Sequence, residues 1–553
     1  MTIRSLLEQH AQAIPDAEAL RSYEGKEWVS RTFAGFLGDV RRMASAYGTA
    51  FELRPREENV ALILQNSPTW MEVYLACSGA GVSVVPIDPK LHNGEVAYIL
   101  GDSGAVVVTT DKAHLDMMRA IVPNLPSVRG VVLVDGEGPC EPIGSVPVRA
   151  LAALCADVRD TSWYDAHVAT VDDIASIIYT SGTTGKPKGA MLTHGNFTSD
   201  AVGALEAFNE SITPADTFLV VLPLFHAFSF CTNFVVPLLT GSGMFFVRSL
   251  YTIGEDVKIL RPTVVMGVPL LAEKIYDKID AKLKSSKKAQ FLMKIGLGRL
   301  VFGAVKKGLG GRLRFMIVGG APCPKHVLEG YKKLGITMLE GYGLTECSPV
   351  VSIAGPKCAR IGTIGAKIAN IEIRLADRNE QGVGELQVKG PITMKGYWHN
   401  DAATEEAFDG EWLKTGDLAS VAEDGLITIC GRKKALIVNR EGKNIYPEEV
   451  ENRIAADPVV ADCVVVGYTT GGVPGEKVGC VVHPNMDLLA ERNGGKEVTW
   501  EEAVKIAQEH VHAQCHDFAD YKRVRKIVVS KEPLERTSIQ KVRRVAYKGM
   551  LNE

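Results

Sequence analysis

The stretch that decides the fold is residues 60–88, VALILQNSPTWMEVYLACSGAGVSVVPID. It starts with the apolar run VALIL, continues through the helical pattern PTWMEVYLACSGAG, and ends in a second apolar run, VSVVPID. Apolar runs separated by a helix of this length predict parallel strands joined by a right-handed crossover. The alternation continues to residue 135 through GEVAYILGDSGA, VVVTTD and GVVLVDG. This part of the chain is therefore predicted to form a parallel sheet with helices on its faces.

The same pattern returns further along the chain, in TFLVVLP, GMFFV and TVVMGVP, and again in RFMIVGG, KHVLEGYKKLG and ITMLEGYG. We expect a doubly wound α/β protein with two sheets. Near residue 370 the pattern changes, and IEIRLADRNEQGVGELQVKG predicts an antiparallel hairpin around a Gly-rich turn. We expect a small β-barrel-like subdomain at about 355–430. From residue 431 onward the chain is rich in charge, which indicates a domain boundary.

Composition narrows the class of protein. The chain has 553 residues, of which 46% are hydrophobic and 23% charged, as in ordinary globular proteins. A net charge of -3 predicts no dominant nucleic-acid surface. The eleven cysteines contain no C-x-x-C pair and lack zinc-site spacing, which favours buried thiols in a reducing compartment. The N-terminus has no apolar signal region, and no apolar run is long enough to span a membrane. We expect a soluble cytoplasmic protein.

A polar loop follows the apolar run IASII. Residues 179–197 read YTSGTTGKPKGAMLTHGNF and combine glycines, hydroxyl side chains and two lysines. Glycines let backbone N-H groups approach a ligand, while hydroxyls and lysines add donors and positive charge. This suits a polyphosphate, although such clusters are also typical of mobile surface loops. Composition alone supports both interpretations equally.

Two familiar phosphate-binding patterns do not fit. The pattern G-x-x-x-x-G-K-[ST] fails because Pro187 follows Lys186 and Gly189 follows Lys188. The dinucleotide fingerprint fails in GYGLTE, where Glu346 stands in place of the third glycine. A simple P-loop hydrolase and a Rossmann dehydrogenase are therefore disfavoured.

A series of motifs identifies a better match. Between residues 179 and 541 the chain contains, in this order, YTSGTTGKPKG, LPLFHAF, VGGAP, GYGLTE, GELQVKG, KTGDL, GRKKALIV, GKNIYPEEVE and LERTSIQK. The chain thereby resembles the adenylate-forming superfamily of acyl-CoA synthetases, luciferases and peptide-synthetase adenylation domains. The resemblance implies that a carboxylic acid reacts with ATP, in the presence of Mg²⁺, to form an acyl-adenylate and pyrophosphate. The CoA thiol then displaces AMP from the acyl-adenylate. It also implies an N-terminal domain (1–430), a hinge (431–436) and a small mobile α/β C-terminal domain (437–553).

The resemblance carries over to individual residues. It implies that a loop from Thr180 to Lys188 holds the β- and γ-phosphates, that Thr345 and Glu346 hold Mg²⁺, and that Asp417 binds ribose. Lys541 would stabilise charge during adenylation, and Gly442 would line the path of the CoA thiol. The implied nucleotide and cofactor contacts are Thr180, Ser181, Gly182, Thr183, Thr184, Lys188, Gly320, Ala321, Pro322, Gly341, Tyr342, Gly343, Asp417, Arg432, Lys434 and Gly442. Two positions depart from the family pattern: Gln540 precedes Lys541 where glycine is usual, and Ala435 follows Lys434 where an acidic residue is usual.

The substrate is suggested by the segment around His226. A lone histidine beside aromatic residues is more often an interior residue than a functional one. The resemblance instead puts His226 at the carboxylate pocket, as a gate or orienting group. FHAFSFCTNF lacks the aspartate of amino-acid-activating relatives, and the region after GVPLLAEKIYDKI is long, so we expect a medium- or long-chain fatty acid. The alternatives are an acyl-AMP ligase that loads a carrier protein, an aryl- or short-chain acyl-CoA ligase, and a non-catalytic acyl- or nucleotide-binding protein.

Residues 282–314 have an unusual charge pattern. They contain ten Lys and Arg residues, no Asp or Glu, and interleaved large apolar residues. A basic amphipathic segment can lie on anionic lipid. More often it is a solvated helix face with a packed underside. We favour the solvated face and keep weak association with a membrane surface as the alternative.

Overall fold

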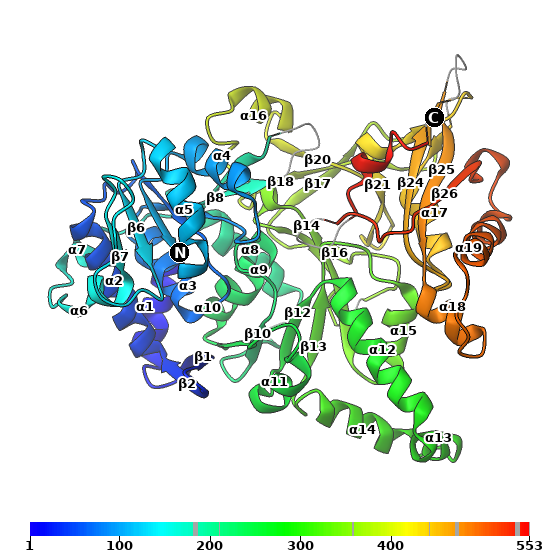
Figure 1. Ribbon diagram of the computed structural model, residues 1–553, viewed down its shortest axis with the longest axis horizontal. Helices are drawn as coiled ribbons and strands as arrows, with labels where there is room; N and C mark the ends of the chain where they lie inside the picture. The colour runs from blue at the N-terminus through cyan, green and yellow to red at the C-terminus, as the bar shows by residue number, and fades with distance from the viewer. Residues whose placement is uncertain are drawn as a thin grey trace.

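The computed structural model describes residues 1–180, 186–208, 211–356, 359–441, 443–469, 475–536 and 542–551. Two large sheets with helices around them form most of the molecule, and the C-terminal part lies to one side of them (Figure 1). This confirms the predicted α/β class and the two doubly wound sheets.

The first sheet has seven strands in the order β7-β6-β5-β3-β4-β8-β9. The pairs from β7 to β8 are parallel, and β9 runs antiparallel to β8. The strands are β3 (Asn59–Leu62), β4 (Ser83–Pro86), β5 (Val107–Thr110), β6 (Gly130–Leu133), β7 (Val148–Ala150), β8 (Ile174–Thr180) and β9 (Lys188–Thr193). The crossover from β3 to β4 is α3 (Pro68–Ser78), which Ser67 caps by accepting a hydrogen bond from the Trp70 N-H. The decisive stretch 60–88 thus forms the predicted strand, helix and strand.

The second sheet has nine strands in the order β16-β15-β14-β13-β12-β10-β11-β1-β2. Its inner pairs are parallel, while β2, β15 and β16 are antiparallel additions at its two edges. The strands are β1 (Glu18–Glu24), β2 (Glu27–Thr32), β10 (Thr217–Val220), β11 (Gly243–Phe246), β12 (Val264–Gly267), β13 (Phe315–Val318), β14 (Thr337–Gly343), β15 (Val350–Ile353) and β16 (Ala366–Lys367).

The two large sheets share one core through buried aromatic side chains. Trp70 and Tyr74 of α3 stack with ring centroids 5.4 Å apart. Tyr74 also lies 4.6 Å from the ring of Phe230 in α9 (Ala227–Phe230), which belongs to the second sheet's half of the domain. Because these rings are fully buried, burial of their apolar area stabilises the packing of one sheet's helices against the other's.

The predicted hairpin is confirmed as β17 (Glu372–Ala376) and β18 (Gly384–Lys389). It continues into a sheet with β19 (Phe408–Asp409), β20 (Trp412–Val421) and β21 (Ile427–Arg432). The expected barrel-like shape is wrong. Closing a barrel requires the two edges of a sheet to pair, and among the described residues β17 pairs with β18 alone, so the sheet stays open.

The C-terminal part has a sheet of its own, with strands β24 (Val460–Tyr468), β25 (Lys477–Pro484) and β26 (Lys526–Val529). It is preceded by the ribbon of β22 (Ile437–Val438) and β23 (Asn444–Ile445). Helices α17 (Pro447–Ile454) and α19 (Trp500–Cys515) pack on it, and Val450, Val465 and Val511 lie in their shared core.

A helical segment follows β12 at the lower end of the molecule (Figure 1). It consists of α12 (Pro269–Ser285), α13 (Lys287–Lys294) and α14 (Gly298–Gly308). The remaining helices are α1 (Ile3–Ala13), α2 (Phe33–Ala50), α4 (Asn93–Ser103), α5 (Leu115–Ile121), α6 (Leu151–Ala156), α7 (Ser162–Ala166), α8 (His194–Glu206), α10 (Val236–Thr240), α11 (Ile253–Leu260), α15 (Lys325–Lys333), α16 (Asp401–Ala407) and α18 (Met486–Arg492).

Candidate active site

One cavity of about 3380 Å³ brings together most of the described candidate residues. It lies at the carboxyl ends of parallel strands of both sheets, where α/β folds usually bind ligands. The candidates that line it are Thr180, Lys188, His226, Gly320, Gly343, Thr345, Glu346, Arg432 and Lys434. Five other described candidates are close in the chain to residues of the cavity wall but are not part of the wall themselves: Ala321, Pro322, Gly341, Tyr342 and Asp417. Ser181, Gly182, Thr183, Thr184, Gly442, Gln540 and Lys541 lie outside the described residues.

Tyr397 links the lysine of the polar loop to the acidic residue of GYGLTE. The Tyr397 hydroxyl donates to Oε1 of Glu346 at 2.8 Å, and the Lys188 ammonium lies 5.2 Å from the centroid of the tyrosine ring. Burial and the nearby Glu346 carboxylate raise the pKa of Tyr397, so the hydroxyl stays a donor. The Lys188 ammonium therefore lies over the face of the tyrosine ring, and the Glu346 carboxylate lies at its hydroxyl end.

Backbone pairing sets the position of Tyr397. The Trp398 N-H donates to the Gly189 carbonyl at 2.7 Å, and the Lys395 N-H donates to the Met191 carbonyl at 3.0 Å. The segment around Tyr397 is thereby aligned along β9, the strand that Lys188 begins. Tyr397 belongs to no motif found in the sequence, and its role follows only from this pairing.

Asp417 is the centre of a second polar group. It faces Arg432 across β20 and β21, and the Arg432 Nε donates to Asp417 Oδ1 at 2.7 Å. The Tyr342 hydroxyl, at the end of β14, donates to the other carboxylate oxygen. Asp417 is 3% exposed, so these contacts hold a buried carboxylate. Three of the candidate nucleotide residues, drawn from two different sheets, are thus joined by direct contacts.

The turn that carries Thr345 and Glu346 depends on a glycine. An ideal Cβ on Gly343 would lie 1.7 Å from the Pro349 carbonyl oxygen, because β14 and β15 pair closely at this point. The Leu344 N-H donates to the same carbonyl at 3.0 Å and closes the turn. Gly343 therefore permits the backbone approach that brings Glu346 to the cavity wall.

Gly343→Ala is expected to lower the free energy of unfolding by about 1–3 kcal/mol, because backbone must move to admit the methyl group. Urea denaturation measures this. Gly341→Ala is the control in the same strand, since its Cβ would lie 3.6 Å from the nearest atom, an ordinary contact. Equal destabilisation by the two substitutions would show that the close approach at Gly343 is not the cause.

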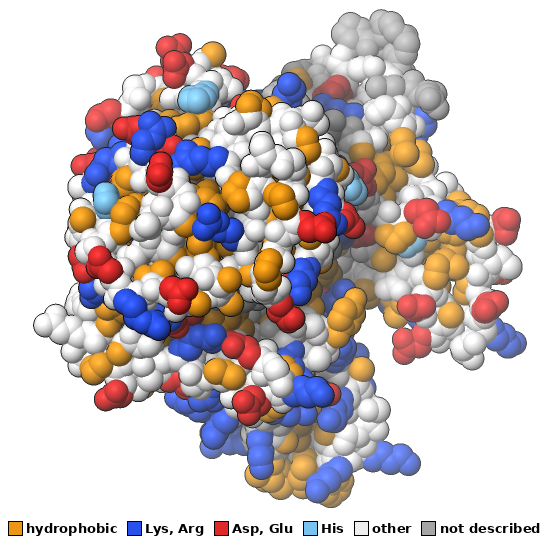
Figure 2. Space-filling view, turned by 60° about the vertical axis from the view of Figure 1, so that its left-hand side comes forward, with side chains coloured by type: hydrophobic (Ala, Val, Ile, Leu, Met, Phe, Trp, Pro, Cys, Tyr) orange, Lys and Arg blue, Asp and Glu red, His pale blue; other side chains and the backbone are white. Residues whose placement is uncertain are grey.

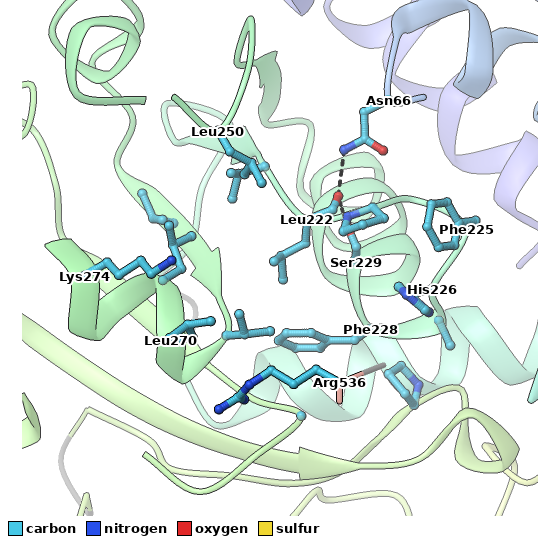
Figure 3. Close-up of a pocket in the computed structure, with 18 of the residues that line it drawn as sticks. Asn66, Leu222, Phe225, His226, Phe228, Ser229, Leu250, Leu270, Lys274 and Arg536 are labelled. Atoms are coloured by element: carbon cyan, nitrogen blue, oxygen red, sulfur yellow. Dashed lines mark hydrogen bonds between the residues drawn. The ribbon is translucent and has the colours of Figure 1, made fainter. Parts of the chain in front are cut away.

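His226 directly precedes α9 and lies beside Phe225, with ring centroids 4.6 Å apart (Figure 3). Burial lowers the pKa of His226 from its ordinary 6.5 to about 4, with a smaller opposing effect of Asp88. The imidazole is therefore neutral near pH 7. A neutral ring can orient a carboxylate by donating a hydrogen bond without adding a positive charge.

The low pKa of His226 has a consequence for stability. Below about pH 6.5 the His226 side chain of the unfolded chain binds a proton, whereas that of the folded chain stays neutral down to about pH 4. The free energy of unfolding therefore decreases as the pH is lowered from about 6.5 to about 4. Between about pH 7.5 and pH 5 the wild type should lose about 2 kcal/mol more than His226→Asn in urea denaturation. His512→Asn, on the exposed side of α19, serves as the control and should behave like the wild type. Equal losses in the wild type and His226→Asn would contradict a neutral His226.

Asn66 ties the segment before His226 to the first sheet. Its side-chain N-H donates to the Leu222 carbonyl at 2.7 Å (Figure 3). Its side-chain oxygen accepts from the Leu224 N-H at 2.9 Å. The Ser229 hydroxyl donates to the Leu222 carbonyl as well. Sequence analysis missed Asn66, for which the only signal is its place just after the apolar run 60–64.

Comparison with known proteins identifies the family of this chain. A family model described as AMP-binding enzyme matches residues 7–398. The long-chain-fatty-acid--CoA ligase FadD15 of Mycobacterium tuberculosis is 30% identical over 506 residues, which are 84% of this chain and 80% of that protein. Long-chain-fatty-acid--CoA ligase 1 of Homo sapiens is 30% identical over 484 residues, 80% of this chain and 68% of that protein.

Solved structures share the fold. ATP-bound MatB from Rhodopseudomonas palustris aligns over 100% of both chains with a TM-score of 0.77 and 24% identity. Anthranilate CoA ligase AuaEII in complex with anthranoyl-AMP aligns over 100% of this chain and 97% of that chain, with a TM-score of 0.77 and 20% identity. The chain belongs to the AMP-binding enzyme family and is an AMP-forming acyl-CoA synthetase, which joins a carboxylic acid to CoA with ATP and Mg²⁺.

Proposed function

We propose that this synthetase activates medium- and long-chain fatty acids. The observation that carries the proposal is an apolar stripe on α12, made of Leu271, Ile275, Ile279 and Leu283, that lines the same cavity as His226. Residues four apart lie on one face of a helix, and the 17 residues of α12 extend over about 25 Å. A long acyl chain would need such a wall, whereas acetate or benzoate would leave most of it uncovered. The names of the two relatives support the same substrate class.

We propose the following roles for the residues of the site. His226 would orient the carboxylate, in a segment that Asn66 holds in place. The β- and γ-phosphates would be bound by Thr180, Ser181, Gly182, Thr183, Thr184 and Lys188. Adenine would lie against Gly320, Ala321, Pro322, Gly341, Tyr342 and Gly343. Asp417 and Arg432 would bind ribose, the carboxylate by accepting hydrogen bonds from the ribose hydroxyls.

Thr345 and Glu346 fit a magnesium site by their chemistry. A hydroxyl and a carboxylate are the hard oxygen donors that Mg²⁺ prefers, and it is commonly bound through one or two carboxylates together with substrate phosphates. Tyr397 holds one oxygen of Glu346 and so limits how the carboxylate can rotate. When bound, Mg²⁺ would offset the charge of the phosphates that the carboxylate of the fatty acid must approach.

The reaction needs no side-chain nucleophile. The carboxylate of the acid would attack the α-phosphate and release pyrophosphate, and the CoA thiol would then displace AMP from the acyl carbon. Like charges at contact repel by about 4 kcal/mol at an effective dielectric near 20, so cations must offset the approach of two anions. We propose that Lys541 does this in the first step. A rotation of residues 437–553 about the hinge at 431–436, which contains Lys434, would then bring Gly442 to the path of the thiol.

A cytoplasmic location is part of the proposal. The ten described cysteines all have free thiols, as is usual in a reducing compartment. Separately, no helix of the described ranges is both long enough and apolar enough to cross a membrane.

The test is a panel of carboxylic acids of graded chain length, with acetate and benzoate included, scored by AMP release in the presence of CoA. We expect kcat/KM to rise by up to about fourfold for each methylene, the equivalent of ~0.8 kcal/mol, until the cavity is full. Ile279→Trp should shift the optimum to shorter acids by filling the far part of the stripe. An optimum on acetate or benzoate would refute the proposed substrate class.

A further inference from the structure

Helix α4 contacts both ends of the polar loop 180–188. At the first end, the Tyr179 hydroxyl donates to Oδ2 of Asp102 at 2.6 Å. At the second end, the Tyr98 hydroxyl donates to the Pro187 carbonyl at 3.2 Å. We call these two hydrogen bonds the α4 clamp. One helix is thereby joined to the chain on both sides of the loop.

Tyr98 and Asp102 lie on one face of α4, because they are four residues apart in the helix. Figure 1 shows α4 beside β8, the strand that ends at Thr180. Neither Tyr98 nor Asp102 lines the cavity of the site. Any effect of these two residues on the reaction must therefore act through the loop residues that they contact.

The residues that the α4 clamp holds directly precede two of the candidate phosphate residues. Tyr179 is followed by Thr180, and Pro187 is followed by Lys188. Thr180 and Lys188 are opposite each other in the ladder of β8 and β9, and both line the cavity. Holding Tyr179 and Pro187 therefore restricts the positions of Thr180 and Lys188 in the cavity wall.

The polar groups of the clamp are more than packing requires. The rings of Tyr98, Tyr179 and Trp398 pack against the core of the first sheet, but packing needs only the rings and not the hydroxyls. Burial and the Asp102 carboxylate raise the pKa of Tyr179, so its hydroxyl keeps the proton that it donates. Asp102 lies in the last turn of α4, where a negative charge is unfavourable for the helix. Its bond to Tyr179 explains this position better than the helix does.

The same end of α4 also contacts the segment that holds Glu346. The Trp398 indole N-H donates to the Asp102 carbonyl at 3.2 Å. Trp398 directly follows Tyr397, whose hydroxyl donates to Glu346. The end of α4 is therefore joined to the candidate phosphate loop and to the segment beside the candidate magnesium ligand.

We propose that Tyr98 and Asp102 are positioning residues for ATP, which place Thr180 and Lys188 for the β- and γ-phosphates by holding the two ends of the loop. Neither Tyr98 nor Asp102 would touch ATP itself. This role rests on the proposed binding of the two phosphates by the loop. Since AMP and acyl-AMP lack the β- and γ-phosphates, the α4 clamp should matter for ATP and not for these two molecules.

The test compares the affinity of the full chain for ATP with Mg²⁺ and for AMP, measured by isothermal titration calorimetry in the absence of a fatty acid. Tyr179→Phe and Asp102→Ala each remove one partner of the same hydrogen bond and should weaken ATP binding by about tenfold. Tyr98→Phe should weaken it by about three- to fivefold, because its bond is to an uncharged carbonyl. The affinity of all three variants for AMP should stay within about twofold of the wild type.

A double variant shows whether the effect comes from the bond between Tyr179 and Asp102. Because the two substitutions break one shared bond, Tyr179→Phe/Asp102→Ala should bind ATP within about twofold of the weaker single variant. Losses that multiply would show that the two residues act separately and would refute the clamp at this end. In pyrophosphate release, Asp102→Ala should raise the KM for ATP by about tenfold, while conversion of supplied acyl-AMP to acyl-CoA stays within about twofold.

The matched controls are Asp116→Ala and Tyr164→Phe. Asp116 is an exposed carboxylate of α5, and the Tyr164 hydroxyl donates to the Glu8 carboxylate at 3.4 Å. Neither Asp116 nor Tyr164 lines the cavity. Basic and acidic side chains are interspersed over the part of the surface that Figure 2 brings forward, so the loss of one carboxylate should not change the general attraction for ATP. Both controls should bind ATP and AMP as the wild type does.

Lys188→Ala separates the α4 clamp from the phosphate site on which it depends. It should weaken ATP binding by at least about tenfold and leave AMP binding unchanged. If it leaves ATP binding unchanged, the proposed phosphate site is wrong and the positioning role is refuted with it. If Lys188→Ala weakens ATP binding but Asp102→Ala and Tyr98→Phe do not, the positioning role alone is refuted. Equal losses of ATP and AMP affinity in the clamp variants would indicate general damage to the fold and would also refute it.

Discussion

Glu346→Gln is expected to lower kcat/KM for acyl-adenylate formation by about 100- to 1,000-fold. The amide keeps the shape of the side chain and its hydrogen bond from the Tyr397 hydroxyl but removes the negative charge that would bind Mg²⁺. Losing one charged contact to the reacting groups in a site with little water costs about 2.7–4 kcal/mol. Pyrophosphate release, measured over a range of Mg²⁺ concentrations, should show both the lower rate and a weaker response to the metal.

Two further substitutions define the cause. Glu406→Gln changes another carboxylate on the cavity wall, one that is exposed, and should stay within about twofold of the wild type. Tyr397→Phe keeps the Glu346 charge but removes the hydroxyl that holds it, and a loss of about tenfold is expected. If Glu406→Gln were as damaging as Glu346→Gln, the loss would reflect the charge of the cavity as a whole rather than the metal ligand.

Lys541→Ala is expected to slow acyl-adenylate formation by more than about 100-fold and to leave the reaction of supplied acyl-AMP with CoA within a few-fold. Lys541 itself lies outside the described residues. Arg536 and Val542, on either side of it in the chain, pair as an isolated bridge and both line the cavity. The described residues that flank Lys541 in the chain therefore lie at the site.

The two half-reactions are measured separately, by pyrophosphate release and by conversion of acyl-AMP to acyl-CoA. Lys548→Ala is the control, because this lysine lies in the same segment and also lines the cavity. It should affect each step by no more than a few-fold. Gly442→Leu is expected to have the opposite selectivity, slowing the CoA step alone by obstructing the path of the thiol. Equal slowing of both steps by Lys541→Ala and by Gly442→Leu would argue against the proposed exchange of the two faces.

Local patterns in the sequence determined the class of the fold and the chemistry. Strand, helix and strand in residues 60–88 follow from apolar periodicity, and the hairpin of β17 and β18 follows from alternation around a Gly-rich turn. The order of the motifs gave the resemblance to a known family, which implied adenylate formation, and each motif lies within a few consecutive residues. These features depend on neighbours in the chain, so the chain alone displays them.

The tertiary structure decided which residues meet. The sheet containing β17 would close into a barrel only if its edge strands, about 50 residues apart in the chain, paired with each other. The alternation of apolar and polar residues along a strand does not specify such a pairing. The hydrogen bond from Tyr397 to Glu346 joins positions 51 residues apart, and that from Asn66 to Leu222 joins positions 156 residues apart. The sequence shows the basic and apolar residues of 282–314, but only the folded chain shows that five apolar side chains stay exposed, and that one of them lines the cavity. The five are Phe291, Met293, Ile295, Leu297 and Leu300, and Leu300 is the one on the cavity wall. The reason is that periodicity specifies the face on which a residue lies, whereas the partner of that face depends on packing between distant segments.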